Sequence, residues 1–219
     1  TMSDNRTAPF EHCPLCASIE VVDYHRDQRR CYRQCRDCQL VFVPSAFHLS
    51  SDEEKTEYDL HENDAQNAGY RGFLNRLAQP LLERLEPQSQ GLDFGSGPGA
   101  CLSVMLEEQG HSVALYDLYY ANYPTLLESR YDFITATEVV EHLANPQVEL
   151  DRLWGLLRSG GQLAMMTKLV ASPEKFANWH YKSDPTHISF FSTATFEYLG
   201  EQWGSAPQFI GADVIIFQK

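Results

Sequence analysis

Three alternating glycines that follow an acid make the most informative stretch of the sequence. Residues 91–100 read Gly-Leu-Asp-Phe-Gly-Ser-Gly-Pro-Gly-Ala, so that Asp93 precedes Gly95, Gly97 and Gly99. Glycine is favoured where the backbone turns sharply and a ligand must approach it closely. The spacing differs from the G-x-G-x-x-G of dinucleotide-binding turns, which place a pyrophosphate on a helix N-terminus. Because the carboxylate would repel a phosphate, we expect a ligand that carries an amino group and hydroxyls.

A second acid follows at the distance expected for a sugar contact. The segment 112–116 has the pattern of a strand, and Asp117 ends it twenty residues after Gly97. In nucleotide-binding βα units, an acid at about this spacing accepts hydrogen bonds from a ribose hydroxyl. The sequence therefore predicts a strand, a glycine turn, a helix and a second strand arranged around a nucleoside.

These residues, together with two downstream segments, resemble the cofactor site of the class I S-adenosylmethionine (SAM)-dependent methyltransferases. Residues 131–136 read as a further strand and run into Thr-Glu-Val-Val-Glu-His-Leu at 137–143, which is similar to the family's motif after strand four. Residues 156–166 are similar to the family's helix, Gly-Gly turn and fifth strand. The resemblance covers residues 68–219 and implies methyl transfer from SAM.

The resemblance also implies which residues contact the cofactor. Asp117 would hold the ribose, and Leu118 or Tyr119 would lie nearest the adenine. Tyr70 or Arg71 could meet the methionyl carboxylate, or both could be surface residues at a helix start. The predicted cofactor residues are Asp93, Gly95, Ser96, Gly97, Gly99, Asp117, Leu118, Thr137, Glu138 and Arg71.

The chain departs from the family between two of the predicted strands. Only 13 residues separate Asp117 from Tyr131, too few for the further helix and strand usual there. We expect the strand that the family has between Asp117 and Tyr131, the third strand of its sheet, to be missing here or reduced to a loop. The fold expected is α/β, with a doubly wound Rossmann-like sheet closed by an antiparallel hairpin over 207–210 and 213–218.

His142 is the first candidate for proton transfer. It belongs to a Glu138-x-x-Glu141-His142 pattern after the third predicted strand. Three roles are open: Glu141 and His142 could brace the loop, His142 could be a general base, or all three side chains could bind a divalent metal. The last possibility follows from the ubiquinone-pathway O-methyltransferases, which the pattern resembles.

His187 is the second candidate. It ends Asp184-Pro-Thr-His187, within a segment over 171–192 that is rich in aromatic residues but lacks periodicity. Such a segment is typical of a lid or a substrate wall. A histidine there suits a general base near neutral pH, and it could equally be a packed residue that holds the lid.

Two pairs of cysteines predict a structural metal site near the N-terminus. Cys13 and Cys16 are separated by 18 residues from Cys35 and Cys38, the spacing of a zinc ribbon. Four thiolates complete a tetrahedral shell and leave no open position, so the zinc would be structural. A redox or disulfide role is the alternative. Cys31 is a fifth thiol nearby that could replace a ligand, although its spacing does not fit the motif. The ribbon could hold substrate, contact a protein partner or cap the other domain.

The sequence divides into three parts. We expect a zinc-ribbon module over 1–50, an acidic helix and linker over 51–67, and the methyltransferase domain over 68–219. Ser51 is the expected N-cap of the acidic helix, with Glu54 in the capping-box position.

Charge and composition limit the classes of binding partner and the cellular setting that we expect. The net charge of the 219 residues is −13, which disfavours nucleic acid and an RNA methyltransferase. No apolar run is long enough to span a membrane, and the start lacks a signal-peptide pattern, so a cytoplasmic setting is expected. Five arginines form either a local basic patch or a solvated loop: Arg26, Arg29, Arg30, Arg33 and Arg36. The leading prediction is a small-molecule methyltransferase, and a non-catalytic SAM-binding protein is the other alternative. The sequence gives no oligomeric state.

Overall fold

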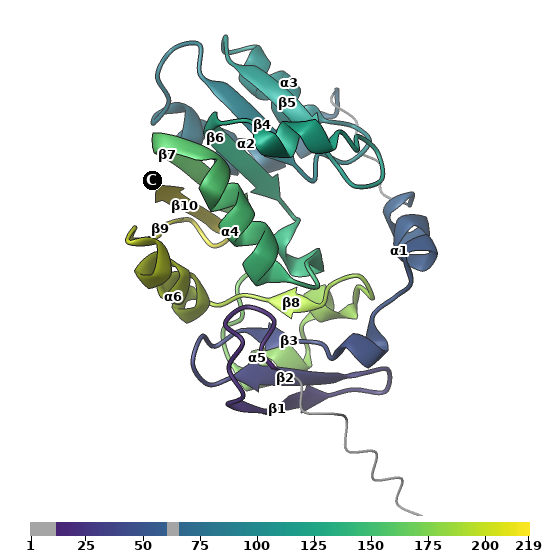
Figure 1. Ribbon diagram of the computed structural model, residues 1–219. Helices are drawn as coiled ribbons and strands as arrows, with labels where there is room; N and C mark the ends of the chain where they lie inside the picture. Colours follow the sequence, from purple (N-terminus) through teal and green to yellow (C-terminus); the bar gives the residue numbers. More distant parts are fainter. Residues whose placement is uncertain (1–11, 61–65) are drawn as a thin grey trace, which may run out of the picture.

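Six strands form a mixed sheet in the order β5-β4-β6-β7-β10-β9 (Figure 1). The computed structural model describes residues 12–60 and 66–219. The strands are β4 (Gln90–Phe94), β5 (Ser112–Tyr116), β6 (Tyr131–Thr137), β7 (Leu157–Met166), β9 (Gln208–Ile210) and β10 (Val214–Gln218). Strands β5, β4, β6 and β7 are parallel, and β10 runs antiparallel to β7 and β9. The predicted closing hairpin is therefore present.

Helices cover both faces of this sheet. The helices are α2 (Ala68–Leu82), α3 (Cys101–Glu107), α4 (Pro146–Leu156) and α6 (Thr193–Trp203). Successive side chains of a strand point to opposite faces. Accordingly, Ala164 and Met166 of β7 pack in one core with α2 and α3, while Leu163 and Met165 pack in another with α4 and α6. This arrangement confirms the predicted doubly wound α/β fold. No described helix has the length and apolar character needed to cross a membrane.

Two segments differ from the family's usual pattern. After β5 the described chain forms a single bridge between Asp117 and Ala121 and then the 3-10 helix η2 (Pro124–Glu128), with no strand before β6. The third strand is therefore missing, as the short segment predicted, and β5 is an edge strand. The Gly-Gly pair at Gly160 and Gly161 lies inside β7 rather than in a separate turn.

The second sheet joins the N-terminal strands to a segment far along the chain. Its order is β1-β2-β3-β8, from β1 (Val21–Arg26), β2 (Cys31–Cys35), β3 (Val41–Phe42) and β8 (Ser189–Phe190). Val41 pairs with Phe190 and Phe42 with Ser189, so the fourth strand comes from the predicted lid segment (Figure 1). Phe176 packs edge to face against Tyr32 of β2 and Phe190 of β8. The proposed domain boundaries near residues 50 and 67 stay predictions.

The acidic helix α1 (Ser51–Tyr58) begins one residue earlier than predicted, at the residue expected to be its cap. Ser50 is its N-cap, and Ser50 and Glu53 form the capping box. The expectation of Ser51 with Glu54 was wrong because the Ser-Ser and Glu-Glu repeats allow two registers one residue apart. The linker predicted after this helix falls partly on 61–65, outside the described residues.

Replacing Gly91 tests the packing of β4. A Cβ at Gly91 would lie 2.1 Å from the Phe133 ring, because the two residues pair across β4 and β6. We expect Gly91→Ala to lower the free energy of unfolding by about 1–3 kcal/mol, as overpacked cores do. Gly72→Ala, where a Cβ has open space in α2, should stabilise by about 0.5–1 kcal/mol. Urea unfolding measures both, and equal effects of the two variants would contradict the packing.

Candidate active site

A cavity of about 660 Å³ lies at the carboxyl ends of β4, β5 and β6. This is the edge where doubly wound folds bind ligands. The predicted site residues that line it are Asp93, Gly95, Ser96, Gly97, Asp117, Leu118, Thr137, Glu138, His142 and His187. A wider depression of about 790 Å³ lies at the opposite edge, lined by residues such as Ser112 and Arg158 instead of the predicted ones. The chemistry-bearing residues thus converge on one cavity.

The glycine turn is shaped by backbone conformations that favour glycine. Gly95 and Gly97 have φ values of 72° and 63°. A Cβ at Gly95 would lie 2.4 Å from Val139 Cγ2. The Gly95 and Ser96 amides donate to the Tyr116 carbonyl, at 2.8 and 3.2 Å. The turn is therefore tied to the end of β5.

Asp117 links the glycine turn to the loop that follows β5. Its Oδ2 accepts a hydrogen bond from the Gly97 amide at 2.9 Å. Its Oδ1 accepts from the amides of Tyr119 and Tyr120 at 2.9 and 3.1 Å. One carboxylate thus fixes the glycine turn and the loop that replaces the missing strand.

Asp93 lies buried beneath the turn. It accepts a hydrogen bond of 2.7 Å from Thr135 Oγ1 on β6. Burial raises the pKa of Asp93 to about 7. The hydrogen bond from Thr135 lowers this pKa, and the nearby charge of Asp117 raises it further. Asp93 can therefore exchange a proton near neutral pH while contacting the cavity.

The acidic helix covers the mouth of the cavity. Glu54 accepts hydrogen bonds from Tyr119 and Tyr58, at 2.7 and 2.6 Å, and Asp59 accepts one from Tyr120 at 2.6 Å. The Tyr58 ring meets His142 edge to face at 5.3 Å. Glu54 and Tyr58 line the cavity. The i, i+4 spacing of Glu54 and Tyr58 was the only signal of this arrangement.

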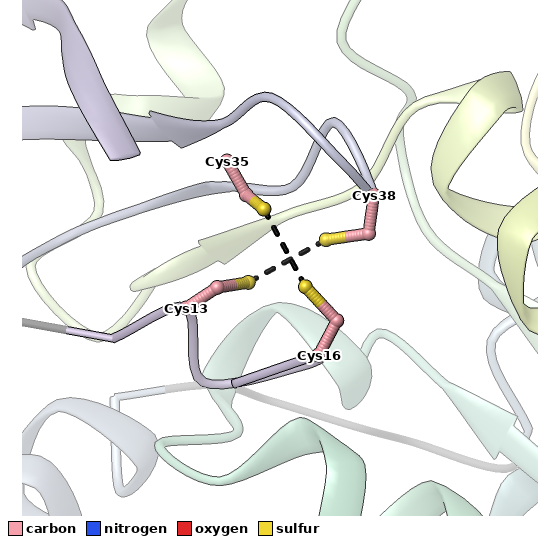
Figure 2. A group of neighbouring side chains, drawn as sticks. All are labelled: Cys13, Cys16, Cys35 and Cys38. Atoms are coloured by element: carbon pink, nitrogen blue, oxygen red, sulfur yellow. Dashed lines mark hydrogen bonds between the residues drawn. The ribbon is translucent and has the colours of Figure 1, made fainter. Parts of the chain in front are cut away.

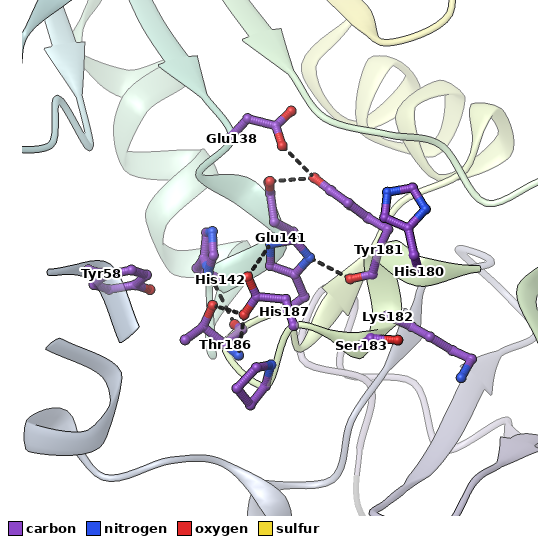
Figure 3. Close-up of polar contacts among 12 residues, drawn as sticks. Tyr58, Glu138, Glu141, His142, His180, Tyr181, Lys182, Ser183, Thr186 and His187 are labelled. Atoms are coloured by element: carbon purple, nitrogen blue, oxygen red, sulfur yellow. Dashed lines mark hydrogen bonds and ion pairs between the residues drawn. The ribbon is translucent and has the colours of Figure 1, made fainter. Parts of the chain in front are cut away.

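Two acids lie close together, Glu138 in the cavity lining and the fully buried Glu141 next to it (Figure 3). The Tyr181 hydroxyl donates to Glu141 Oε1 and lies 3.2 Å from Glu138 Oε2. Thr167 Oγ1 donates to Glu141 Oε2 at 3.2 Å. Burial raises the pKa of Glu141 to about 8, with the neighbouring Glu138 charge adding to the shift. Burial also raises the pKa of Glu138. Burial and the neighbouring charge thus both favour the protonated form of Glu141.

The two histidines meet at the cavity. Their rings are 4.7 Å apart and edge to face (Figure 3). His142 Nδ1 donates to the Thr186 carbonyl at 3.2 Å, and His187 Nδ1 donates to the Tyr181 carbonyl at 2.7 Å. Since carbonyls only accept, these bonds place the proton of a neutral ring on Nδ1 and leave Nε2 as the basic atom. His187 Nε2 lies 3.6 Å from Asp184 Oδ2.

The grouping of possible metal ligands differs from the predicted one. Ligand atoms of Glu141, His142 and His187 lie within 4.8 Å of one another, and Glu138 is not part of this set in the described chain. The Glu141 carboxyl contacts Tyr181 and Thr167 through both oxygens. These contacts favour the bracing role for Glu141.

The four cysteines of the paired motifs converge (Figure 2). The Cys13 and Cys38 sulfurs lie 3.4 Å apart, as do those of Cys16 and Cys35, so no disulfide joins them. A hydrogen bond with Cys38 lowers the pKa of Cys13 to about 6 against the effect of burial. Cys31 lies outside the cluster.

Two predicted cofactor residues lie away from the cavity lining. Arg71 forms an ion pair with Glu108, and Gly99 follows the turn without lining the cavity in the described chain. Tyr70, the alternative to Arg71, does line it.

The comparisons with known proteins agree with this geometry. A family model described as a methyltransferase domain matches residues 65–205, and the chain belongs to this family of SAM-dependent class I methyltransferases. It is therefore an enzyme. No curated protein matches the chain.

Several solved structures share the fold. The 1,6-didemethyltoxoflavin-N1-methyltransferase of Burkholderia thailandensis, solved with 1,6-didemethyltoxoflavin and S-adenosylhomocysteine, is 15% identical, with a TM-score of 0.51 over 90% of this chain and 98% of that one. A SAM-dependent methyltransferase from Archaeoglobus fulgidus is 16% identical, with a TM-score of 0.53 over 68% and 94%. An O-methyltransferase family protein from Burkholderia thailandensis is 16% identical, with a TM-score of 0.50 over 84% and 65%. At these identities the likeness establishes the fold.

The buried Glu141 predicts a pH-dependent stability. Its folded pKa, about 8, lies above the ordinary value of 4.5, so its contribution is full below about pH 4.5 and is lost as pH rises to 8. We expect the melting temperature of Glu141→Gln, relative to the wild type, to increase from pH 5 to pH 8 and then level off. Thermal scans measure this, with the exposed Glu83→Gln as control. A difference that does not vary with pH would contradict the buried acid.

Proposed function

We propose that the protein transfers the methyl group of SAM to a small-molecule acceptor held in the same cavity. The observation that carries this proposal is that one cavity of about 660 Å³ contacts both the glycine turn and the histidine pair. SAM supplies an activated methyl group when bound. The task of the chain is then to align donor and acceptor, which can lower the barrier by roughly 7–11 kcal/mol.

The cofactor would lie against the glycine turn. Asp117 would hold the ribose, Leu118 would lie near the adenine, and Tyr70 would lie at the methionyl end. Among the described residues, the buried side-chain polar atoms without a hydrogen-bond partner are Thr137 Oγ1 and Glu138 Oε1. Both residues line the cavity, so these atoms fit a polar ligand that satisfies them.

The acceptor would lie beside the histidines. His142 and His187 each present Nε2 as the basic atom, so either can take a proton from an acceptor hydroxyl or amine. Asp184 Oδ2 lies 3.6 Å from His187 Nε2 and would stabilise the positive charge of that ring once Nε2 has taken the proton. The negative net charge and the acids Glu54 and Asp184 on the wall favour a small molecule over RNA.

We also propose that Cys13, Cys16, Cys35 and Cys38 bind one structural zinc ion. Three of the four side chains are buried, and the sulfur separations of 3.4 Å suit four ligands at about 2.3 Å from a shared ion. Because the small sheet has few core residues of its own, zinc binding would supply part of its folding energy.

Cofactor affinity tests the assignment of Asp117. We expect Asp117→Ala to weaken S-adenosylhomocysteine binding at least tenfold, because a charge-assisted acceptor and the support of three backbone amides are both removed. Isothermal calorimetry measures the affinity, and Asp151→Ala on the remote face of α4 is the matched control. An unchanged dissociation constant for Asp117→Ala would rule out the assignment.

Metal analysis tests the zinc ribbon. We expect about one zinc per chain by mass spectrometry, with Cys13→Ser losing zinc and melting at a lower temperature. Cys31→Ser should keep its zinc. A folded, zinc-free wild-type protein would exclude a structural zinc.

A further inference from the structure

One arginine of the N-terminal part is buried against the loop that carries His187. Arg30 lies in the turn between β1 and β2, and only 8% of it is exposed. Its guanidinium donates hydrogen bonds to the carbonyls of Lys182, Asp184 and Pro185 at 2.7, 3.0 and 3.1 Å. These bonds join positions more than 150 residues apart in the sequence.

The neighbouring side chains complete the contact. Arg29 donates to the Ser183 carbonyl at 3.2 Å, so the two arginines satisfy four successive carbonyls, from 182 to 185. In return, Lys182 donates to Asp27 Oδ2 at 3.2 Å. Backbone carbonyls that are buried without a donor are costly. The hairpin thus supplies side-chain donors to four carbonyls of this loop, of which, in the described chain, only that of Asp184 is also given a backbone donor from within it, the His187 amide.

Asp27 is linked to the buried guanidinium through Tyr32, because Arg30 Nε donates to the Tyr32 hydroxyl at 3.0 Å and that hydroxyl donates to Asp27. Its Oδ1 accepts hydrogen bonds from the amides of Arg29 and Arg30, at 2.9 and 3.0 Å, and its Oδ2 accepts one from Tyr32. Burial alone would raise the pKa of Asp27, but these bonds and the one from Lys182 outweigh it and hold the pKa well below its ordinary value. Asp27 therefore stays charged at neutral pH.

The same loop positions both histidines (Figure 3). The Thr186 carbonyl, one residue beyond the last carbonyl bound by Arg30, accepts from His142 Nδ1. The His187 amide donates to the Asp184 carbonyl at 3.2 Å, and the Ile188 amide donates to the Glu141 carbonyl at 2.8 Å. A shift of the loop would therefore move both rings.

We propose that Arg30 is a positioning residue for the acceptor half of the active site, and that the N-terminal module is a structural wall of that site. This inference rests on the proposed methyl transfer at His142 and His187. A planar guanidinium with five donors can bind three carbonyls in different directions, whereas a lysine ammonium is a compact point charge. The geometry thus requires arginine and not merely a positive charge.

Two variants and a matched control test this role. Arg30→Lys keeps the charge, Arg30→Met keeps the length, and Arg33→Met removes a surface arginine of β2 that pairs with Asp23. The measurements are amide hydrogen exchange over residues 186–188, the ring resonances of the two histidines by NMR, zinc content, and calorimetry with S-adenosylhomocysteine.

We expect both Arg30 variants to exchange these amides at least tenfold faster and to shift the resonances of His142 and His187. Zinc content and S-adenosylhomocysteine affinity should stay within twofold of the wild type, and Arg33→Met should match the wild type throughout. Wild-type exchange and ring resonances in Arg30→Lys would overturn the proposal. Loss of zinc with faster exchange along the whole chain in both variants would also overturn it, because Arg30 would then only stabilise the fold. Absence of S-adenosylhomocysteine affinity in the wild type would instead count against the proposed function.

Discussion

The carboxylate of Asp117 is the interaction on which the cavity depends most. It accepts three backbone amides, one from the glycine turn after β4 and two from the loop after β5. Amides in a tight buried turn need such an acceptor. The loop held in this way places Tyr119 and Tyr120 against the acidic helix α1. Asp117 therefore supports both the glycine turn and the contacts of α1 with the cavity.

Much of the fold could be predicted because its determinants are local. The glycines, the acid before them and the strand patterns specify a βα unit within a few residues, and the count of 13 residues before Tyr131 predicts the missing strand. The cysteine pairs likewise predict their own clustering. The helix start was wrong by one residue because Ser50 with Glu53 and Ser51 with Glu54 offer the same capping chemistry.

The parts that escaped prediction depend on contacts between distant segments. Arg30 belongs to a run of arginines that suggested either a basic patch or a solvated loop, whereas Arg30 is buried and Arg33 remains at the surface. Nothing in the local sequence distinguishes these two positions. Similarly, the place of Tyr181 beside Glu138 and Glu141 has no periodic signal, since it lies in a single short 3-10 helix, η4 (His180–Ser183), that contacts the residues following β6.

The pairing of β3 with β8 has a consequence for biosynthesis. The first three strands of the small sheet leave the ribosome early, but the fourth consists of residues 189–190 of 219. Contacts between such distant segments form slowly, because a long loop must close before they are gained. The edge of β3 therefore stays unpaired until residues 189–190 have been synthesised, and an unpaired strand edge can pair with a wrong strand in the interval.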